Sequence, residues 1–318
     1  MIFPSVSIII AVKQNNPLLE ECVDHCIKLD YPFFEVIILP DDMMGVYNER
    51  HIKIIATGKA LPAAKRDIGA SNASGEILAF LDDDTYPTAD WLKNAVINFN
   101  EESIACVGGP AVTPENEPFL NKASGKVYES LIISGPARFR YVPLRKRFTD
   151  DFPSCNFFIR NNIFQEIGGF KTKFWPGEDT ILCLEVVHKL KKRILYDPAV
   201  IVYHHRRQLF KKHLSQIVSY ATHRGYFLKR YPQTSLKFGY FIPSIMTAII
   251  LGSLILGLVS DLRFFYVPLF YLLFVFVFSI QKSLKLSFYV FAGSILTHLT
   301  YGLNFIKGFL SFRLREEL

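Results

Sequence analysis

Three long apolar runs in the C-terminal third limit the folds open to this chain more than any other feature. They cover residues 240–260, 264–280 and 288–306. A helix needs about 20 apolar residues to cross a bilayer, so the first run is long enough and the second just long enough. Asp261 is the only acidic residue within this stretch, while His298 and Asn304 interrupt the third run. We therefore expect an all-α transmembrane region of two or three helices at residues 236–318, rather than a buried helical hairpin in a soluble core.

The rest of the chain is expected to stay in the cytoplasm. The first 16 residues do not match a secretory signal, because Pro4 breaks their apolar part. Five scattered cysteines suit a reducing compartment. Lys282 and Lys285 would return to the cytoplasm after two spans, in line with the positive-inside rule. These features predict a multi-pass protein of the cell membrane, whether inner or plasma membrane, with a cytoplasmic N-terminal domain.

The net charge of +7 is concentrated just before the apolar region. Residues 189–230 contain eleven Lys or Arg and a single acid, Asp197. Such a patch can bind nucleic acid, anionic lipid or a phosphorylated substrate. Its place beside the membrane segment favours membrane lipids and phosphorylated ligands over nucleic acid. Apolar residues recur at helical spacing from Phe210 to Ala221, which predicts an amphipathic interfacial linker at residues 206–235, with an ordinary docking helix as the alternative.

The first 110 residues alternate strand-like and helix-like stretches. Predicted strands lie at 6–12, 35–42, 51–57, 77–81 and 104–110, and predicted helices at 17–29 and 61–74. Further on we expect a strand and short helix at 153–170, a helix start within 175–190, a loop at 138–148 and a last strand at 196–207. This alternation predicts an α/β domain with a mostly parallel central sheet, which we assign to residues 1–205. Ligands of such sheets bind beyond the carboxyl ends of the strands.

Acidic residues stand at two of these strand ends and at one helix start. They are Asp41 and Asp42, then Asp82, Asp83 and Asp84, and finally Glu178 and Asp179. Adjacent carboxylates repel one another unless a cation compensates. Mg²⁺ and Mn²⁺ bind carboxylate oxygens and commonly bridge to substrate phosphates, so the clusters predict a metal and a phosphate-bearing ligand. The alternatives are a solvated turn with a helix N-cap for the three aspartates and helix-dipole stabilisation for Asp179.

The order of five motifs resembles a known family. They read "VSIIIAV", "EVIILPDD", "AAKRDIGASNASGEILAFLDDD", "CNFFIRNNIFQEIGGF" and "GEDTIL". Together they are similar to the family 2 glycosyltransferases of the GT-A fold over roughly residues 5–210, and the membrane helices that follow resemble members that build exopolysaccharide or lipid-linked glycans. The resemblance implies a Rossmann-like, mostly parallel central sheet, a nucleotide-sugar donor and Mn²⁺ or Mg²⁺ as cofactor.

The resemblance also assigns roles by position. For the donor nucleotide it implies Asp41, Asp42, Lys65, Arg66, Asp82 and Asp83. For the metal it implies Asp84, Asp82 and His204, and for the diphosphate His205, Arg206 and Arg207. Asp179 matches the catalytic base, and Glu178 is its partner in the acceptor site.

The chain departs from the family pattern in three places. "DDMMG" replaces the usual Asp-Asp-Gly-Ser turn, and Asp67 replaces the usual Asn after the Arg. No Gln-x-x-Arg-Trp motif follows the last predicted strand, which argues against a processive synthase.

The resemblance and the acidic clusters together imply an inverting, metal-dependent glycosyltransferase of the hexosyltransferase type. We expect it to move a single sugar from a nucleotide-diphosphate donor to a membrane or lipid-linked acceptor in polysaccharide or glycan assembly. One alternative is a polyprenyl-phosphate glycosyl synthase, whose acceptor is the lipid phosphate itself. An alternative of another class is a membrane-anchored subunit that binds nucleotide sugar without turnover.

Overall fold

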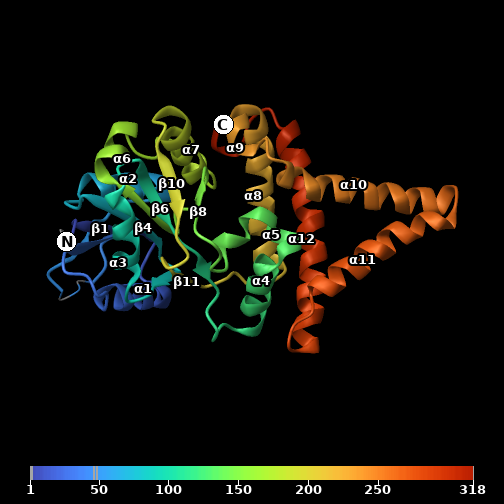
Figure 1. The fold of residues 1–318 in the computed structure, drawn as a ribbon, viewed down its shortest axis with the longest axis horizontal. Helices are drawn as coiled ribbons and strands as arrows, with labels where there is room; N and C mark the ends of the chain where they lie inside the picture. The colour runs from blue at the N-terminus through green and yellow to red at the C-terminus, as the bar shows by residue number, and fades with distance from the viewer. Residues whose placement is uncertain (1–2, 46, 48, 318) are drawn as a thin grey trace. The chain divides into compact units, whose positions relative to one another are not determined.

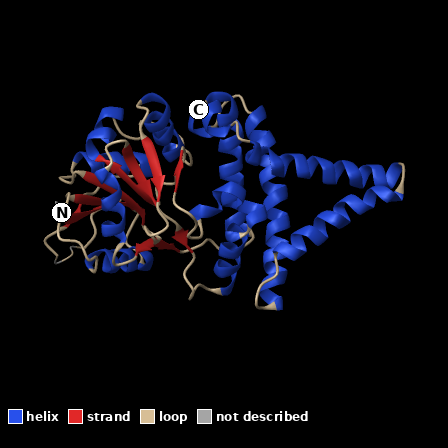
Figure 2. Cartoon of the chain, viewed as in Figure 1, coloured by secondary structure: helices blue, strands red, loops and turns tan. Residues whose placement is uncertain are grey.

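The computed structural model describes residues 3–45, 47 and 49–317. The chain divides into two compact units, which we call the sheet unit (residues 1–112 and 139–205) and the helical unit (residues 113–138 and 206–318). The sheet unit ends at residue 205, where we expect the N-terminal domain to end. Residues 113–138, however, group with the helices. Figure 2 distinguishes the strands of the first unit from the helices of the second.

The sheet unit is built on an eight-stranded sheet with the order β3-β2-β1-β4-β9-β6-β10-β8. In that order the strands are Ile52–Ile54, Phe34–Leu39, Val6–Ala11, Ile77–Asp82, Asn156–Arg160, Ile104–Gly108, Arg193–Tyr196 and Arg147–Thr149. Strands β3, β2, β1 and β4 run parallel, as do β6 and β10. Strand β9 is antiparallel to both of its neighbours, and β8 is antiparallel to β10. The expected α/β fold with a mostly parallel sheet is therefore confirmed.

Two layers of helices cover the sheet because alternate residues of each strand point to opposite faces. On one face Ile8 and Ile10 of β1 pack in the core formed with α1 (Pro17–Ile27) and α3 (Trp91–Val96). On the other face Ile9 packs in the core formed with α2 (Pro62–Ser71), α6 (Asn161–Ile167) and α7 (Glu178–Leu184). Figure 1 shows these two groups of helices on opposite sides of the sheet.

A second, three-stranded sheet follows the aspartate cluster. Strand β11 (Val202–His204) lies between β5 (Thr85–Pro87) and β7 (Ala111–Val112). The expected last strand at 196–207 is confirmed in part: it is the shorter β11, because β10 ends at Tyr196 and Asp197 starts a turn by accepting a hydrogen bond from the Ala199 amide. The expected loop at 138–148 is also wrong in part, because its end forms β8 against β10.

The helical unit contains the remaining labelled helices. They are α4 (Phe119–Glu129), α5 (Leu131–Ser134), α8 (Lys211–Arg230), α9 (Pro232–Ser235), α10 (Phe238–Val259), α11 (Tyr266–Phe278) and α12 (Leu284–Leu310). Helices α8 and α12 pack backbone against backbone: a Cβ on Gly225 would lie 2.0 Å from the Phe305 carbonyl oxygen, and one on Gly308 would lie 2.0 Å from that of Thr222. Within this unit α10 and α11 form a helical hairpin that extends away from α12 (Figure 1).

Helix α10 buries small polar side chains and exposes most of its large apolar side chains. Its buried positions include Ser244, Thr247 and Ser253, whereas Leu258 is 78% exposed. The neighbouring α11 exposes Phe270 to 75%. A helix that packs against a soluble core shows the reverse arrangement. Helix α10 and the stretch 284–317 are both long and apolar enough to cross a membrane, while the apolar stretch 262–278 is shorter.

Candidate active site at the carboxyl end of β4

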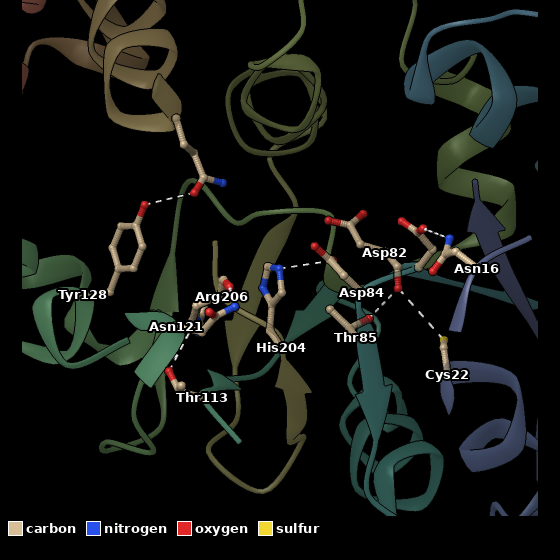
Figure 3. A network of polar contacts seen from close by, with 12 residues as sticks. Asn16, Cys22, Asp82, Asp84, Thr85, Thr113, Asn121, Tyr128, His204 and Arg206 are labelled. Atoms are coloured by element: carbon tan, nitrogen blue, oxygen red, sulfur yellow. Dashed lines mark hydrogen bonds and ion pairs between the residues drawn. The ribbon is translucent and has the colours of Figure 1, made fainter. Parts of the chain in front are cut away.

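The three aspartates form the turn that joins β4 to β5. Asp82 is the last residue of β4, and its carbonyl oxygen accepts a hydrogen bond from Thr85 Oγ1 at 2.7 Å. This bond tightens the turn, so Asp83 and Asp84 cannot continue the strand. The three carboxylates have different partners: Asp82 pairs with Arg66, Asp83 accepts a hydrogen bond from Asn16, and Asp84 lies beside His204. Figure 3 shows Asp84 turned toward His204. The separate partners reduce the repulsion that the sequence implies.

Asp82 is paired with a buried arginine. Its Oδ1 lies 2.6 Å from Arg66 Nη2, and Arg66 Nη1 lies 3.0 Å from Glu178 Oε1. The arginine side chain is only 4% exposed and lies over the ring of Phe170. Arg66 therefore joins the end of β4 to the start of α7, and each acid that it contacts was predicted to belong to the site.

Asp83 connects the turn to the start of α1. Its Oδ2 accepts a hydrogen bond from Asn16 Nδ2 at 2.8 Å, while Asn16 Oδ1 caps α1 by accepting from the amides of Leu18 and Leu19. Burial raises the pKa of Asp83 to about 6, and the charges of Asp84 and Asp82 add to that rise. Asp83 thus supports the turn through the N-cap of the neighbouring helix.

Asp84 faces His204 across the small sheet. Strand pairing sets His204 opposite Thr85, and the His205 amide donates to the Asp84 carbonyl oxygen at 3.0 Å. As a result Asp84 Oδ1 and His204 Nε2 lie 3.2 Å apart, and both side chains are partly exposed (Figure 3).

This pair fits a divalent cation. Two neighbouring ligands of an octahedral ion with bonds of about 2.1 Å are separated by about 3 Å. A carboxylate with an imidazole is a suitable donor set for Mn²⁺, whereas Mg²⁺ favours oxygen ligands. Across the described ranges the structure brings no three His, Cys, Asp or Glu side chains together as a complete metal site. The remaining ligands of a cation at Asp84 and His204 would therefore come from substrate phosphates and water.

His205 points away from this pair toward α1. Its Nε2 lies 2.9 Å from Glu21 Oε2, and its ring packs beside that of Tyr86. The Glu21 contact had no sequence signal, because it depends on α1 lying beside the small sheet. It fixes the residue next to His204.

Arg206 and Arg207 belong to the helical unit. Arg206 is buried there, with its amide donating to Glu117 Oε1 at 3.0 Å and its Nε donating to Thr113 Oγ1 at 3.2 Å (Figure 3). Its guanidinium also lies over the Tyr128 ring. Arg207 is exposed.

Lys65 supports Asp41 at the ends of β1 and β2. Its ammonium donates to Asp41 Oδ1 at 2.5 Å, to the Val12 carbonyl oxygen at 2.6 Å and to the Leu39 carbonyl oxygen at 3.1 Å. An ammonium has three donors, and these contacts occupy all of them. Lys65 therefore orders Asp41, while Asp42 beside it is exposed.

Glu178 and Asp179 occupy the first turn of α7, as the sequence predicts. Both carboxylate oxygens of Asp179 accept backbone hydrogen bonds, Oδ1 from Thr180 at 2.7 Å and Oδ2 from Ser154 at 3.4 Å. Burial raises the pKa of Asp179 to about 7, and the charges of Glu178 and Asp151 contribute to that rise. A carboxylate with this pKa can accept a proton near neutral pH.

Sequence reasoning missed Asp151. It is buried next to the base candidate, and its Oδ1 accepts a hydrogen bond from Thr180 Oγ1 at 3.1 Å. The pair Asp150 and Asp151 follows no predicted strand or helix, so the sequence offered no signal that one of them is buried.

The fold and this site together define a glycosyltransferase with a GT-A-like sheet. The family model described as "Glycosyl transferase family 2" matches residues 7–168, which is about half of the chain. The chain belongs to this family, and the resemblance drawn from its motifs is confirmed.

Curated relatives carry glycosyltransferase names. The chain is 29% identical to the pre-mycofactocin glycosyltransferase of Mycobacterium tuberculosis over 172 residues, 53% of this chain and 35% of that protein. It therefore spans about a third of that relative. It is 23% identical over 243 residues, 71% of this chain and 74% of the relative, to the dolichyl N-acetyl-alpha-D-glucosaminyl phosphate 3-beta-D-2,3-diacetamido-2,3-dideoxy-beta-D-glucuronosyltransferase of Methanococcus voltae.

Solved structures share the fold. The mannosyltransferase PcManGT from Pyrobaculum calidifontis, in complex with GDP-Man and Mn²⁺, matches with a TM-score of 0.68 and 14% identity, covering 98% of this chain and 88% of that one. GalNAc-T7 with UDP, GalNAc and Mn²⁺ matches with a TM-score of 0.50 and 15% identity, covering 74% of this chain and 52% of that one. At these identities the likeness shows the fold alone.

Proposed function

We propose that this protein transfers a single sugar from a nucleotide-diphosphate donor to a lipid-linked acceptor, with inversion at the anomeric carbon. The observation that carries the proposal is that two of the predicted acids have different surroundings, each suited to a different role. Asp84 with His204 has the spacing of a cation site, whereas Asp179, the base candidate, is held by two backbone amides and has a pKa near neutrality.

Asp84 and His204 would hold the cation, with Mn²⁺ favoured by the imidazole and Mg²⁺ as the alternative. When bound there, such a cation supplies positive charge for the diphosphate that leaves. Asp82 was also predicted as a ligand, and in the proposal it instead orders the turn through its ion pair with Arg66. Within the sheet unit, His205 remains our candidate for a further diphosphate contact, while Arg206 and Arg207, which were predicted for the same role, belong to the helical unit.

Asp41 and Asp42 are the proposed contacts to the donor nucleotide. Lys65 fixes Asp41 from within the sheet. Arg66, Asp82 and Asp83 were predicted to contact the nucleotide directly, but in the structure they contact groups of the protein. We therefore propose that these three residues act indirectly, by fixing the turn that follows β4 and the start of α7.

Asp179 is the proposed general base. It takes the proton from the acceptor hydroxyl as that oxygen bonds to the anomeric carbon, and the bond from this carbon to the diphosphate oxygen breaks with its electron pair leaving on the diphosphate. Attack on the face opposite the leaving group inverts the anomeric centre. Such proton transfer typically contributes about 10²–10⁴-fold to the rate. The presence of this base favours an enzyme over the alternative of a non-catalytic binding subunit.

The lipid-linked acceptor is supported by the name of the Methanococcus relative, which includes a dolichyl-linked sugar phosphate. The outward apolar surfaces of α10 and α11 support a membrane location. Lys237 precedes α10 and Lys282 follows α11, so both open ends of the hairpin carry a cation. We propose a multi-pass protein of the cell membrane whose sheet unit is cytoplasmic and whose cations contact anionic lipids.

The test is a transfer assay with the full chain in detergent and Mn²⁺. The donors are GDP-mannose, UDP-N-acetylglucosamine and UDP-N-acetylgalactosamine, and the acceptors are a polyprenyl N-acetylglucosaminyl phosphate and a bare polyprenyl phosphate. We expect a product on the sugar-bearing acceptor, with an anomeric configuration opposite to that of the donor by NMR. A product only on the bare phosphate would identify a polyprenyl-phosphate glycosyl synthase. Absence of turnover with every donor would overturn the proposed activity.

A further inference from the structure

Asp151 is a buried carboxylate that the proposed reaction does not yet use. It is 4% exposed and lies in the segment that leads into β9. Arg140 Nη2 lies 3.4 Å from Asp151 Oδ2 and donates to the Asp151 carbonyl oxygen at 2.8 Å. The other carboxylate oxygen, Oδ1, accepts the hydroxyl hydrogen of Thr180. A carboxylate held on both oxygens in this way has a fixed orientation.

These contacts lead directly to the proposed base. The amide of Thr180 donates to Asp179 Oδ1, so the residue that Asp151 holds is the residue that holds Asp179. The amide of Ser154, three positions after Asp151, donates to the other oxygen, Asp179 Oδ2. One short segment, residues 151–154, therefore restrains both sides of the Asp179 carboxylate.

We propose that Asp151 is a positioning residue for the transfer reaction: through Thr180 it fixes the Asp179 carboxylate in the orientation that receives the acceptor proton. This inference rests on the proposed role of Asp179. A displacement of a reacting group by about 1 Å can cost about a hundredfold in rate, so the restraint has a measurable value.

Asp151 also acts on Asp179 through its charge. The charged and titratable groups that act on Asp179 from the surrounding elements are Glu178, Asp151, Arg140, Arg66 and Cys183. Burial is the largest cause of the raised pKa of Asp179, Glu178 and Asp151 add to it, and Arg140 opposes it. Neutralising Asp151 would remove a negative charge that raises the pKa of Asp179. It would also leave the positive charge of Arg140 without its carboxylate partner. Both changes lower the pKa of Asp179.

The experiment compares Asp151→Asn with Asp150→Asn, which makes the same charge change one residue earlier. Transfer is measured against pH with the three nucleotide sugars and the polyprenyl N-acetylglucosaminyl phosphate named above. For the wild type we expect an acidic limb of kcat/KM near the pKa of Asp179. In Asp151→Asn this limb moves to lower pH and kcat falls, while in Asp150→Asn the limb stays in place. An unmoved limb in Asp151→Asn would overturn the inference, because a merely structural role changes stability and not this profile.

Thr180→Val is the second variant, chosen because Asp151→Asn disturbs a buried ion pair. It keeps the shape of the side chain and the Thr180 amide but removes the hydroxyl that Asp151 holds. We expect kcat to fall by about tenfold to a hundredfold, with unchanged affinity for the nucleotide in Mn²⁺ by calorimetry. Wild-type kcat in this variant would contradict the positioning role. If the wild-type protein itself transfers no sugar, the proposed function is refuted. Failure of the proposed function can therefore be told apart from failure of the positioning role.

Discussion

Arg66 Nη1 lies 3.0 Å from Glu178 Oε1, although the two residues are 112 positions apart in the chain. The same guanidinium holds Asp82 at the end of β4. The side that carries the aspartate turn and the side that carries the base candidate are therefore joined by one buried cation. Arginine suits this role because its planar fork can hold two carboxylates at once.

Replacement of Arg66 should be among the most destabilising changes in the sheet unit. Arg66→Gln leaves Asp82 and Glu178 without their cation, and breaking a buried pair typically costs about 3–5 kcal/mol. Thermal or denaturant unfolding of the purified chain measures the loss. The matched control is Arg193→Gln, which breaks the exposed pair with Glu101 and should cost no more than about 1 kcal/mol. Equal losses in the two variants would show that Arg66 is not a structural bridge.

Asp179→Asn should stabilise the folded chain at alkaline pH. The pKa of Asp179 is raised to about 7, mainly by burial, with Glu178 and Asp151 adding to it. An unfolded aspartate has a pKa of about 3.9, so the folded chain binds this proton more tightly and loses stability as pH rises between these values. The variant removes that loss. Its unfolding temperature should exceed that of the wild type at about pH 8, and this difference should be smaller at about pH 5. An advantage that grows toward acid would contradict the assigned pKa.

Asp84→Asn and His204→Ala should each weaken nucleotide binding that depends on Mn²⁺. Loss of one of two protein ligands lowers metal affinity by about tenfold or more, as even supporting residues of metal sites do. Calorimetry with GDP and UDP, with and without Mn²⁺, measures the effect. His188→Ala is the control for the histidine variant, since His188 is exposed on the same unit and lies outside the proposed site. If both site variants keep the metal-dependent affinity of the wild type, Asp84 and His204 do not hold the cation.

Ile249→Asp tests the lipid contact of α10. Ile249 lies near the middle of the helix with 49% of its surface exposed, and a charge at the centre of a membrane helix costs about 2.5–3.5 kcal/mol. We expect less chain in the carbonate-washed membrane fraction. Phe33→Asp is the control, because Phe33 is an exposed apolar residue of the sheet unit. Equal membrane retention of the two variants would argue that α10 does not face lipid.

Local pattern was enough to predict the elements that bear the site. The apolar run before Asp82 forms β4, the acids at 178 and 179 open α7, and the three apolar runs give α10, α11 and α12. His298 does not interrupt the last helix, because it is buried with partners in Tyr271 and the Ile132 carbonyl oxygen. Periodicity and strand ends are properties of neighbouring residues, so the sequence shows them directly.

The partners of the site residues could not be predicted, because they depend on elements distant in the chain. The pairing of β5 with β11 brings His204 to Asp84, and the packing of α1 beside the turn brings Asn16 to Asp83. Asp151 gave no signal for the same reason. Family resemblance supplied the candidate residues, but only the folded chain separates those with a cation-site geometry from those that contact neighbouring side chains.

The assignment of Asp179 as the base is the central claim, and one variant tests it most directly. Asp179→Asn keeps the shape of the side chain and removes its ability to accept the proton. The measurement is single-turnover transfer from a nucleotide sugar to the polyprenyl N-acetylglucosaminyl phosphate, alongside Mn²⁺-dependent nucleotide binding. We predict that binding is retained and that transfer falls by about 10²-fold or more. Transfer at the wild-type rate in Asp179→Asn would contradict the account.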